Sequence, residues 1–113
     1  MIKIYHNNRC SKSRCALALL EESGKEFEII NYLQTKPSAE ELASIISKLK
    51  IKPFELIRKT EPIFLEKFKG KDLSDKEWIQ AMVEYPILIE RPIIISDGLA
   101  VIARPAEKIN EIF

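Results

Sequence analysis

Histidine, cysteine and glycine are scarce in this chain of 113 residues, which contains one histidine, two cysteines and three glycines. With so few nitrogen and sulfur ligands, a structural zinc site is not expected. The chain has 18 lysines and arginines and 17 acidic residues, so its formal net charge is only +1. No overall positive potential therefore favours binding to nucleic acid or to anionic lipid. The longest apolar runs (CALALL, PILI, PIII) are far shorter than the roughly 20 residues of a membrane span. We therefore expect neither a nucleic-acid nor a membrane partner.

The composition that remains is that of a folded domain. The chain is 46% hydrophobic and 31% charged, which is typical of a globular protein and not of a disordered one. Its length allows one domain, residues 1–113, and we expect a monomer. The sequence opens with the strand-like MIKIY and lacks the pattern of a signal peptide, so we expect a cytoplasmic protein with reduced thiols.

The first third predicts a β-α-β unit. Residues 2–5 (IKIY) suit a short strand, and FEIINYL (27–33) is a second β-branched, aromatic run. Between them, Ser11 or Ser13 is expected to cap a helix that continues to about Glu22 and stops at Gly24. Two strands joined by one helix favour a parallel pair.

The middle of the chain predicts a helical insertion at about residues 38–84. Ser38 is expected to cap one helix, and Pro53 and Pro62 each begin a short segment. Ser74 and Glu77 have the spacing of a capping box, which predicts a helix to about Glu84.

The last third returns to β-rich sequence. ILIE (87–90), PIIIS (92–96) and LAVIA (99–103) are expected to be strands, Asp97-Gly98 predicts a tight hairpin, and Pro105 opens a helix to about Ile112. The predicted class is therefore α/β: a thioredoxin-like fold whose mixed four-stranded sheet, β-α-β plus a β-hairpin and a helix, has helices on both faces.

Cys10 stands where the first strand turns into the first helix. A thiolate there would face unpaired backbone N–H groups and the positive end of the helix dipole, which lower a cysteine pKa. Polar residues surround Cys10, which favours a reactive thiol, although a buried and inert cysteine is the alternative.

Cys15 invites the hypothesis of a redox pair with Cys10. Within a helix, five positions rise about 7.5 Å, which is too far for the usual Cα separation of a disulfide. The apolar ALALL that follows Cys15 favours a core position instead.

The chain has only five arginines, against 13 lysines. Arg9 and Arg14 flank Cys10, and Arg91 and Arg104 each precede a proline beside a predicted strand, whereas Arg58 lies in the middle segment. Guanidinium groups suit tetrahedral oxyanions. Together with a thiolate they would form an oxyanion-processing site. The alternative is that these arginines form ordinary ion pairs on the surface.

Two further features concern the same region. A proline at the start of an interior strand is unusual, and a cis Arg91-Pro92 bond would explain it. His6 is either a packed strand residue or a catalytic base.

These motifs resemble those of the glutaredoxin-linked arsenate reductases, the ArsC/Spx group of the thioredoxin-like superfamily. The matching segments are IYHNNRCSKSR, NYLQTKPSAEEL, LIRKTEP, EYPILIERPIII and VIARPAEKI, and they occur in the family's order over essentially the whole chain. Asn8 stands where the family usually has proline, and Tyr85 where histidine is common.

The resemblance implies roles for the candidate residues. Cys10 would be the nucleophile that attacks arsenate, Arg58, Arg91 and Arg104 would bind the oxyanion, and His6 would help to keep the cysteine ionised. Ser13 and Arg14 fall in the active loop and would contact substrate. Glutathione as co-substrate and glutaredoxin as partner would complete the reduction to arsenite, with no bound cofactor or metal.

Two other functions remain open at the level of sequence. The first is an Spx-like, redox-responsive regulator that binds RNA polymerase, but such proteins use a CxxC switch and this chain has serine at position 13. The second is a thiol oxidoreductase acting on another substrate. The three arginines favour the enzyme that reduces arsenate.

Overall fold

A computed structural model of the chain describes residues 2–111. These residues form two compact units. The described residues up to Thr35 and from Arg91 onward make the first, here called the sheet unit, and Lys36–Glu90 make the second, the helical unit. In residues 2–111, every helix is too short or too polar to cross a bilayer.

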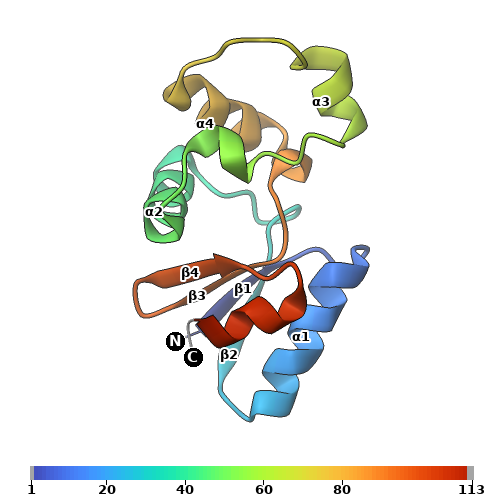
Figure 1. Cartoon of the computed structure of the whole chain (residues 1–113), viewed down its shortest axis with the longest axis vertical. Helices are drawn as coiled ribbons and strands as arrows, with labels where there is room; N and C mark the ends of the chain where they lie inside the picture. The colour runs from blue at the N-terminus through green and yellow to red at the C-terminus, as the bar shows by residue number, and fades with distance from the viewer. Residues whose placement is uncertain (1, 112–113) are drawn as a thin grey trace. The chain divides into compact units, whose positions relative to one another are not determined.

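The sheet unit contains a mixed four-stranded sheet in the order β2-β1-β3-β4 (Figure 1). Its strands are β1 (Ile2–His6), β2 (Phe27–Asn31), β3 (Ile93–Ser96) and β4 (Leu99–Ile102). β1 pairs parallel with β2 and antiparallel with β3, and β3 pairs antiparallel with β4. The predicted β-α-β unit and β-hairpin are therefore confirmed. Asp97 and Gly98 both have positive φ, 48° and 85°, as a type I′ hairpin turn requires.

Two helices cover one face of this sheet. They are α1 (Ser11–Ser23) and the 3₁₀ helix η3 (Ala106–Glu111). Alternate residues of the strands pack against them, because successive side chains of a strand point to opposite faces. The buried cluster on this face is formed by Ile2, Ile4, Ala16, Leu20, Ile94, Val101, Ala103, Ala106 and Ile109. Both helices of the sheet unit thus lie on the same face.

Helix α1 begins one residue after Cys10 and ends at Gly24. Gly24 has φ 74° and adopts the left-handed conformation that terminates the helix, as predicted. The prediction that Ser11 or Ser13 caps the helix is wrong, because Cys10 is the N-cap residue and no side chain caps the helix. The hydroxyl of Ser13 has other partners, which are described below.

Cys15 is exposed on α1, so its predicted place in the core is wrong. The buried positions of the helix are Ser13, Ala16 and Leu20. Because each residue turns the helix by about 100°, the residue before Ala16 is carried off the buried stripe. The apolar run after Cys15 indicated the helix correctly but did not fix which residues face the sheet.

The helical unit contains α2 (Ala39–Leu49), η1 (Pro53–Leu56), α3 (Pro62–Lys67), α4 (Asp75–Glu84) and η2 (Pro86–Leu88). Ser38 caps α2 through the N–H of Glu41, and Ser74 forms a capping box with Glu77 at the start of α4, as predicted. The ring of Trp78 packs among three phenylalanine rings, those of Phe54, Phe64 and Phe68.

Two predictions about the last third need correction. The ILIE run (87–90) is not a strand: it is half 3₁₀ helix, and Ile89 forms only an isolated bridge with Ile57. Proline at position 86 fixes a helical φ at the first position and favours the 3₁₀ turn. The final helix is a 3₁₀ helix through Glu111, and its predicted end at Ile112 lies outside the described residues. The Arg91-Pro92 bond is cis as predicted, and the Arg104-Pro105 bond is cis as well.

Candidate functional site

Cys10 lies at the edge of the sheet where β1 ends and α1 begins. Its backbone N–H donates to the carbonyl of Asn7 at 3.0 Å, and its own carbonyl accepts from the N–H of Arg14 at 3.0 Å. The second bond is the first of the helix, so the sulfur stands beside the open N–H groups of the first turn. The predicted location of Cys10 at a strand-to-helix turn is confirmed.

This environment lowers the pKa of Cys10. Partial burial opposes ionisation, but the N–H of Ser13, the guanidinium of Arg91 and the N–H of Lys12 together outweigh it. The net pKa of the Cys10 thiol is therefore below its ordinary value, as hydrogen bonds and positive charge favour the thiolate. A larger fraction of Cys10 is ionised near neutral pH than in an unperturbed cysteine.

Arg91 and Arg104 both reach Cys10 from the other end of the chain. The Nη1 atom of Arg104 lies 3.9 Å from the sulfur of Cys10 and donates to the carbonyl of Arg91 at 3.1 Å. The guanidinium of Arg91 lies close enough to the same sulfur to lower the pKa of Cys10. Arg91 is buried, with 6% of its surface exposed, whereas Arg104 is half-buried. Two of the three arginines predicted to face Cys10 are thus brought to it within the sheet unit.

The pairing register explains why these arginines meet. β3 runs antiparallel to both β1 and β4, with Tyr5 opposite Ile93 and Ile93 opposite Ile102. Arg91 precedes the start of β3 and Arg104 follows the end of β4, so both lie at the sheet edge where β1 ends. The N–H of Ala103 donates to the carbonyl of Pro92 at 2.9 Å, which extends the β3–β4 pairing in this direction.

His6 reaches the cysteine loop through Ser13. The Nδ1 atom of His6 lies 2.6 Å from the hydroxyl of Ser13, and that hydroxyl also accepts from the N–H of Asn7 at 3.1 Å. Burial and then the charge of Arg14 lower the pKa of His6 below its ordinary value, so the ring is neutral at pH 7. His6 therefore acts on the loop as a neutral hydrogen-bonding group, and Ser13, fully buried, offers the site its backbone N–H.

The remaining predicted residues have partners of their own. The exposed Arg14 donates from Nη1 to the carbonyl of Asn8 at 2.9 Å and so closes the loop that contains Cys10. Arg58 belongs to the helical unit, where its Nε lies 3.2 Å from a carboxylate oxygen of Glu61. The roles predicted for both residues in binding substrate stay predictions.

Two buried residues near Cys10 were missed in the sequence. Asn7 is 4% exposed, and its side-chain oxygen accepts from the N–H of Arg9 at 3.0 Å. Tyr32 is fully buried directly after β2. The polar HNN segment after the first strand was the sequence feature that could have drawn attention to Asn7. The sequence has no comparable feature that marks Tyr32 as a buried residue.

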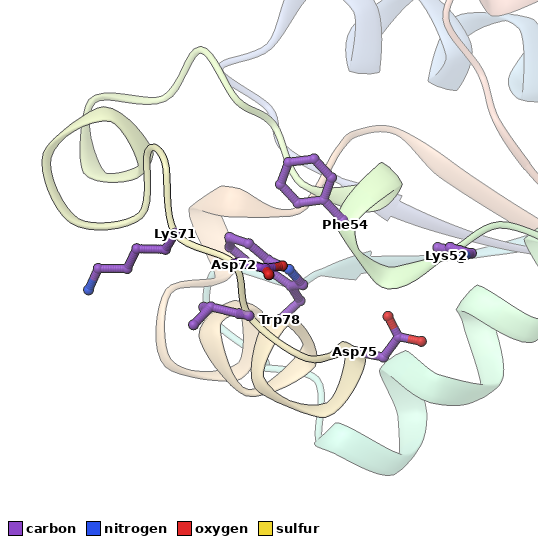
Figure 2. A pocket seen from close by; sticks show the side chains of 7 residues that line it. Lys52, Phe54, Lys71, Asp72, Asp75 and Trp78 are labelled. Atoms are coloured by element: carbon purple, nitrogen blue, oxygen red, sulfur yellow. The ribbon is translucent and has the colours of Figure 1, made fainter.

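A pocket in the helical unit offers no comparable chemistry (Figure 2). It has a volume of about 230 Å³, and its lining contains Lys52, Phe54, Lys71, Asp72, Leu73, Asp75 and Trp78. Figure 2 shows Lys71 and Asp75 pointing away from Trp78 on different sides, so their charges do not converge on one ligand. The lining includes neither a thiol nor a histidine. In residues 2–111, no three side chains of the metal-binding types gather into a possible metal site.

The chemistry available at Cys10 is that of a nucleophile beside an anion site. A thiolate with a lowered pKa is the reactive form of cysteine. Two guanidiniums beside it supply donors that suit the oxygens of a tetrahedral anion and stabilise negative charge that develops on them.

Comparisons with known proteins find relatives along nearly the whole chain. The model of the ArsC family matches residues 5–112. A protein of Escherichia coli K12 called uncharacterized protein YfgD is 44% identical over 98% of this chain and 95% of its own length. An arsenate reductase of Neisseria meningitidis is 39% identical over 98% of this chain and 97% of its own length. The solved structure of an arsenate reductase from Vibrio cholerae has a TM-score of 0.95 and 43% identity, and the match covers 99% of this chain and 97% of that one.

Proposed function

Because this chain belongs to the ArsC family, we propose that it is an arsenate reductase in which Cys10 is the nucleophile. The observation that carries the proposal is the arrangement at Cys10, whose sulfur has a lowered pKa and lies among the donors of Arg91 and Arg104. Relatives named arsenate reductase at 39% identity support arsenate as the oxyanion. The proposed chemistry uses thiols and guanidinium groups and requires neither a metal nor a bound cofactor.

The proposed reaction begins when arsenate binds between the two guanidiniums. The Cys10 thiolate attacks arsenic, a sulfur–arsenic bond forms, and one oxygen leaves as water after taking up protons. The arginines neutralise the incoming anion, which would otherwise be repelled by the thiolate, and stabilise its oxygens during the attack. Backbone N–H groups of Lys12 and Ser13 keep the thiolate ionised before attack.

Glutathione is the proposed second thiol. Its attack releases arsenite and leaves a disulfide between Cys10 and glutathione, so arsenate and two thiols yield arsenite, one disulfide and water. Arsenic gains two electrons, and the two sulfurs lose them. Glutaredoxin then attacks the glutathione sulfur and returns Cys10 to the thiol, which restores the enzyme.

The proposed electron donor is tested by exchanging the donor in a coupled assay. The purified protein is supplied with arsenate and NADPH, in one arm with glutathione, glutaredoxin and glutathione reductase, and in the other with thioredoxin and thioredoxin reductase. We expect arsenate-dependent oxidation of NADPH in the first arm only. Equal rates in the second arm would overturn the proposed donor, and no turnover in either arm would overturn the proposed activity.

A further inference from the structure

Asn7 is a buried polar residue that joins the end of β1 to the loop of Cys10. Its side-chain oxygen accepts from the N–H of Arg9 at 3.0 Å, and its carbonyl accepts from the N–H of Cys10 at 3.0 Å. Its own N–H donates to the hydroxyl of Ser13 at 3.1 Å. Asn7 is 4% exposed, so its side chain is largely shielded from water. One asparagine therefore bonds to three points of the loop, and of these bonds the one to Arg9 depends on its side chain.

The bonds of Asn7 define the turn that leads into α1. A carbonyl that accepts from the N–H three residues later closes a β-turn, here residues 7–10. Asn8 and Arg9, the central residues of this turn, do not have positive φ. This fits a type I turn and excludes type II, which needs positive φ at its third residue. Asparagine is favoured at the first position of a type I turn, because its side chain accepts from the N–H two residues on.

The turn determines where the sulfur of Cys10 stands. Cys10 is the last residue of the turn and the N-cap of α1, and the Nη1 atom of Arg104 lies 3.9 Å from its sulfur. Arg104 follows β4, which the sheet joins to β1 through β3. Because the sheet fixes these strands, the turn after β1 sets the position of the sulfur relative to Arg104.

We propose that Asn7 is a positioning residue of the candidate site, whose side-chain oxygen holds the turn that sets the sulfur of Cys10 beside Arg104. The amide acts through the backbone of Arg9 and not on the substrate. The consequence for catalysis rests on the proposed function. The consequence for the thiol does not, because Arg91 and the first N–H groups of α1 lower the pKa of Cys10 in the free protein, and their effect depends on where the sulfur stands.

Proline at position 8 offers an independent way to hold the same turn. Its ring fixes φ near the value of about −60° that the second position of a type I turn requires. Asn8 occupies this position and is exposed, and the two hydrogen bonds of the turn do not use its N–H. Its carbonyl, which accepts from Arg14, is kept in proline. Asn8→Pro should therefore replace the constraint that Asn7 supplies without replacing the buried amide.

The test measures Cys10 in protein that carries Cys15→Ser, so that Cys10 is the sole thiol. The variants are Asn7→Ala, Asn7→Ala with Asn8→Pro, and Asn8→Ala. Asn8→Ala is the matched control, because it removes the same amide from an exposed position one residue later. For each variant we measure the pH dependence of alkylation by iodoacetamide, and KM and kcat for arsenate in the coupled assay.

For Asn7→Ala we expect the pKa of Cys10 to rise and kcat/KM for arsenate to fall by about two- to tenfold, the range of one neutral hydrogen bond. Adding Asn8→Pro should return both quantities towards the parent values, although the buried amide is still absent. Asn8→Ala should match the parent. If Asn7→Ala does not fold, Asn7→Ser, which keeps a shorter acceptor, should change both quantities in the same direction by less.

Two results would overturn the proposal. One is a Cys10 pKa and kcat/KM in Asn7→Ala, or in Asn7→Ser where it takes its place, equal to those of Asn8→Ala. The other is a variant with Asn8→Pro whose values remain those of Asn7→Ala, since the amide would then act in another way than by holding the turn. Failure of the proposed function gives a different pattern, in which the parent does not reduce arsenate but the Cys10 pKa still rises in Asn7→Ala and returns with Asn8→Pro.

Discussion

The Nη1 atom of Arg104 lies 3.9 Å from the sulfur of Cys10, although 94 positions separate the two residues in the sequence. The same atom is anchored at 3.1 Å by the carbonyl of Arg91. The contact depends on the sheet, because β1 ends beside the start of β3, and the start of β3 pairs with the end of β4. The fold therefore creates the proposed oxyanion site by bringing the last arginine of the chain to the first cysteine.

Removing the charge of Arg104 tests whether this contact has a role in catalysis. Arg104→Gln should lower kcat/KM for arsenate by about 10- to 100-fold, because hydrogen bonds from a charged donor contribute more than neutral ones. The matched control is Arg9→Gln, which removes an exposed arginine from the loop before Cys10. Steady-state kinetics of both variants provide the comparison, and equal losses would show that only the net charge of the region matters.

The pH dependence of Cys10 alkylation tests its lowered pKa. Only the thiolate reacts, so the rate rises as pH passes through the thiol pKa. In Cys15→Ser protein, the midpoint for reaction with iodoacetamide should lie below that of free N-acetylcysteine measured under the same conditions. Arg91→Gln should move the midpoint upward, because the guanidinium stabilises the thiolate. A midpoint at or above that of the free thiol would contradict the described environment.

His6 should make the folded protein sensitive to mild acid. Burial and then the charge of Arg14 lower the pKa of His6 in the folded protein. When the pH falls below the pKa of this histidine in the unfolded chain, the unfolded chain therefore binds a proton more readily than the folded protein does. Stability contributed by neutral His6 is complete above the unfolded pKa, near 6.5, and is lost as pH falls through the folded pKa. The measurement is the melting temperature between pH 7.5 and pH 5, chosen as a range about the ordinary histidine pKa.

His6 is the only histidine of the chain, which makes the assignment direct. We expect His6→Asn, which keeps a polar side chain beside Ser13, to lose most of the decline in melting temperature over this range. A decline of the same size in the variant would show that another group controls the acid response.

The hydroxyl of Ser13 is expected to matter for stability as well as for the loop. Ser13→Ala leaves the N–H of Asn7 and the ring of His6 without their shared partner in a buried site, which should cost about 1–3 kcal/mol of unfolding free energy. Urea denaturation measures this loss. Ser11→Ala, at an exposed position two residues earlier, should change it by less than about 0.5 kcal/mol. Similar values for both variants would contradict a structural role of the hydroxyl.

Local signals in the sequence were sufficient for much of the fold. The capping residues Ser38 and Ser74, the stop at Gly24 and the Asp97-Gly98 hairpin are all determined by neighbouring residues, and the structure confirms each. Cys10 could be placed at the start of α1 for the same reason, since a polar turn follows a short strand and precedes a helical run.

Positions that depend on packing were harder to predict. Cys15 was assigned to the core because ALALL follows it, but the phase of α1 relative to the sheet decides burial and leaves Cys15 exposed. The ILIE run has strand composition, yet Ile89 pairs only with Ile57 and the run does not join the sheet. Tyr32 lies in a β-branched and aromatic run, and its full burial directly after β2 could not be predicted from that composition.

The central claim is that Cys10 alone provides the protein's thiol chemistry in the reduction of arsenate. The most direct measurement is the arsenite formed by Cys15→Ser protein with glutathione, glutaredoxin, glutathione reductase and NADPH, beside the wild type and Cys10→Ser. We predict that Cys15→Ser forms arsenite at the wild-type rate, with one NADPH consumed for each arsenite, and that Cys10→Ser forms none. Loss of arsenite formation in Cys15→Ser, or its persistence in Cys10→Ser, would contradict a single-cysteine reductase.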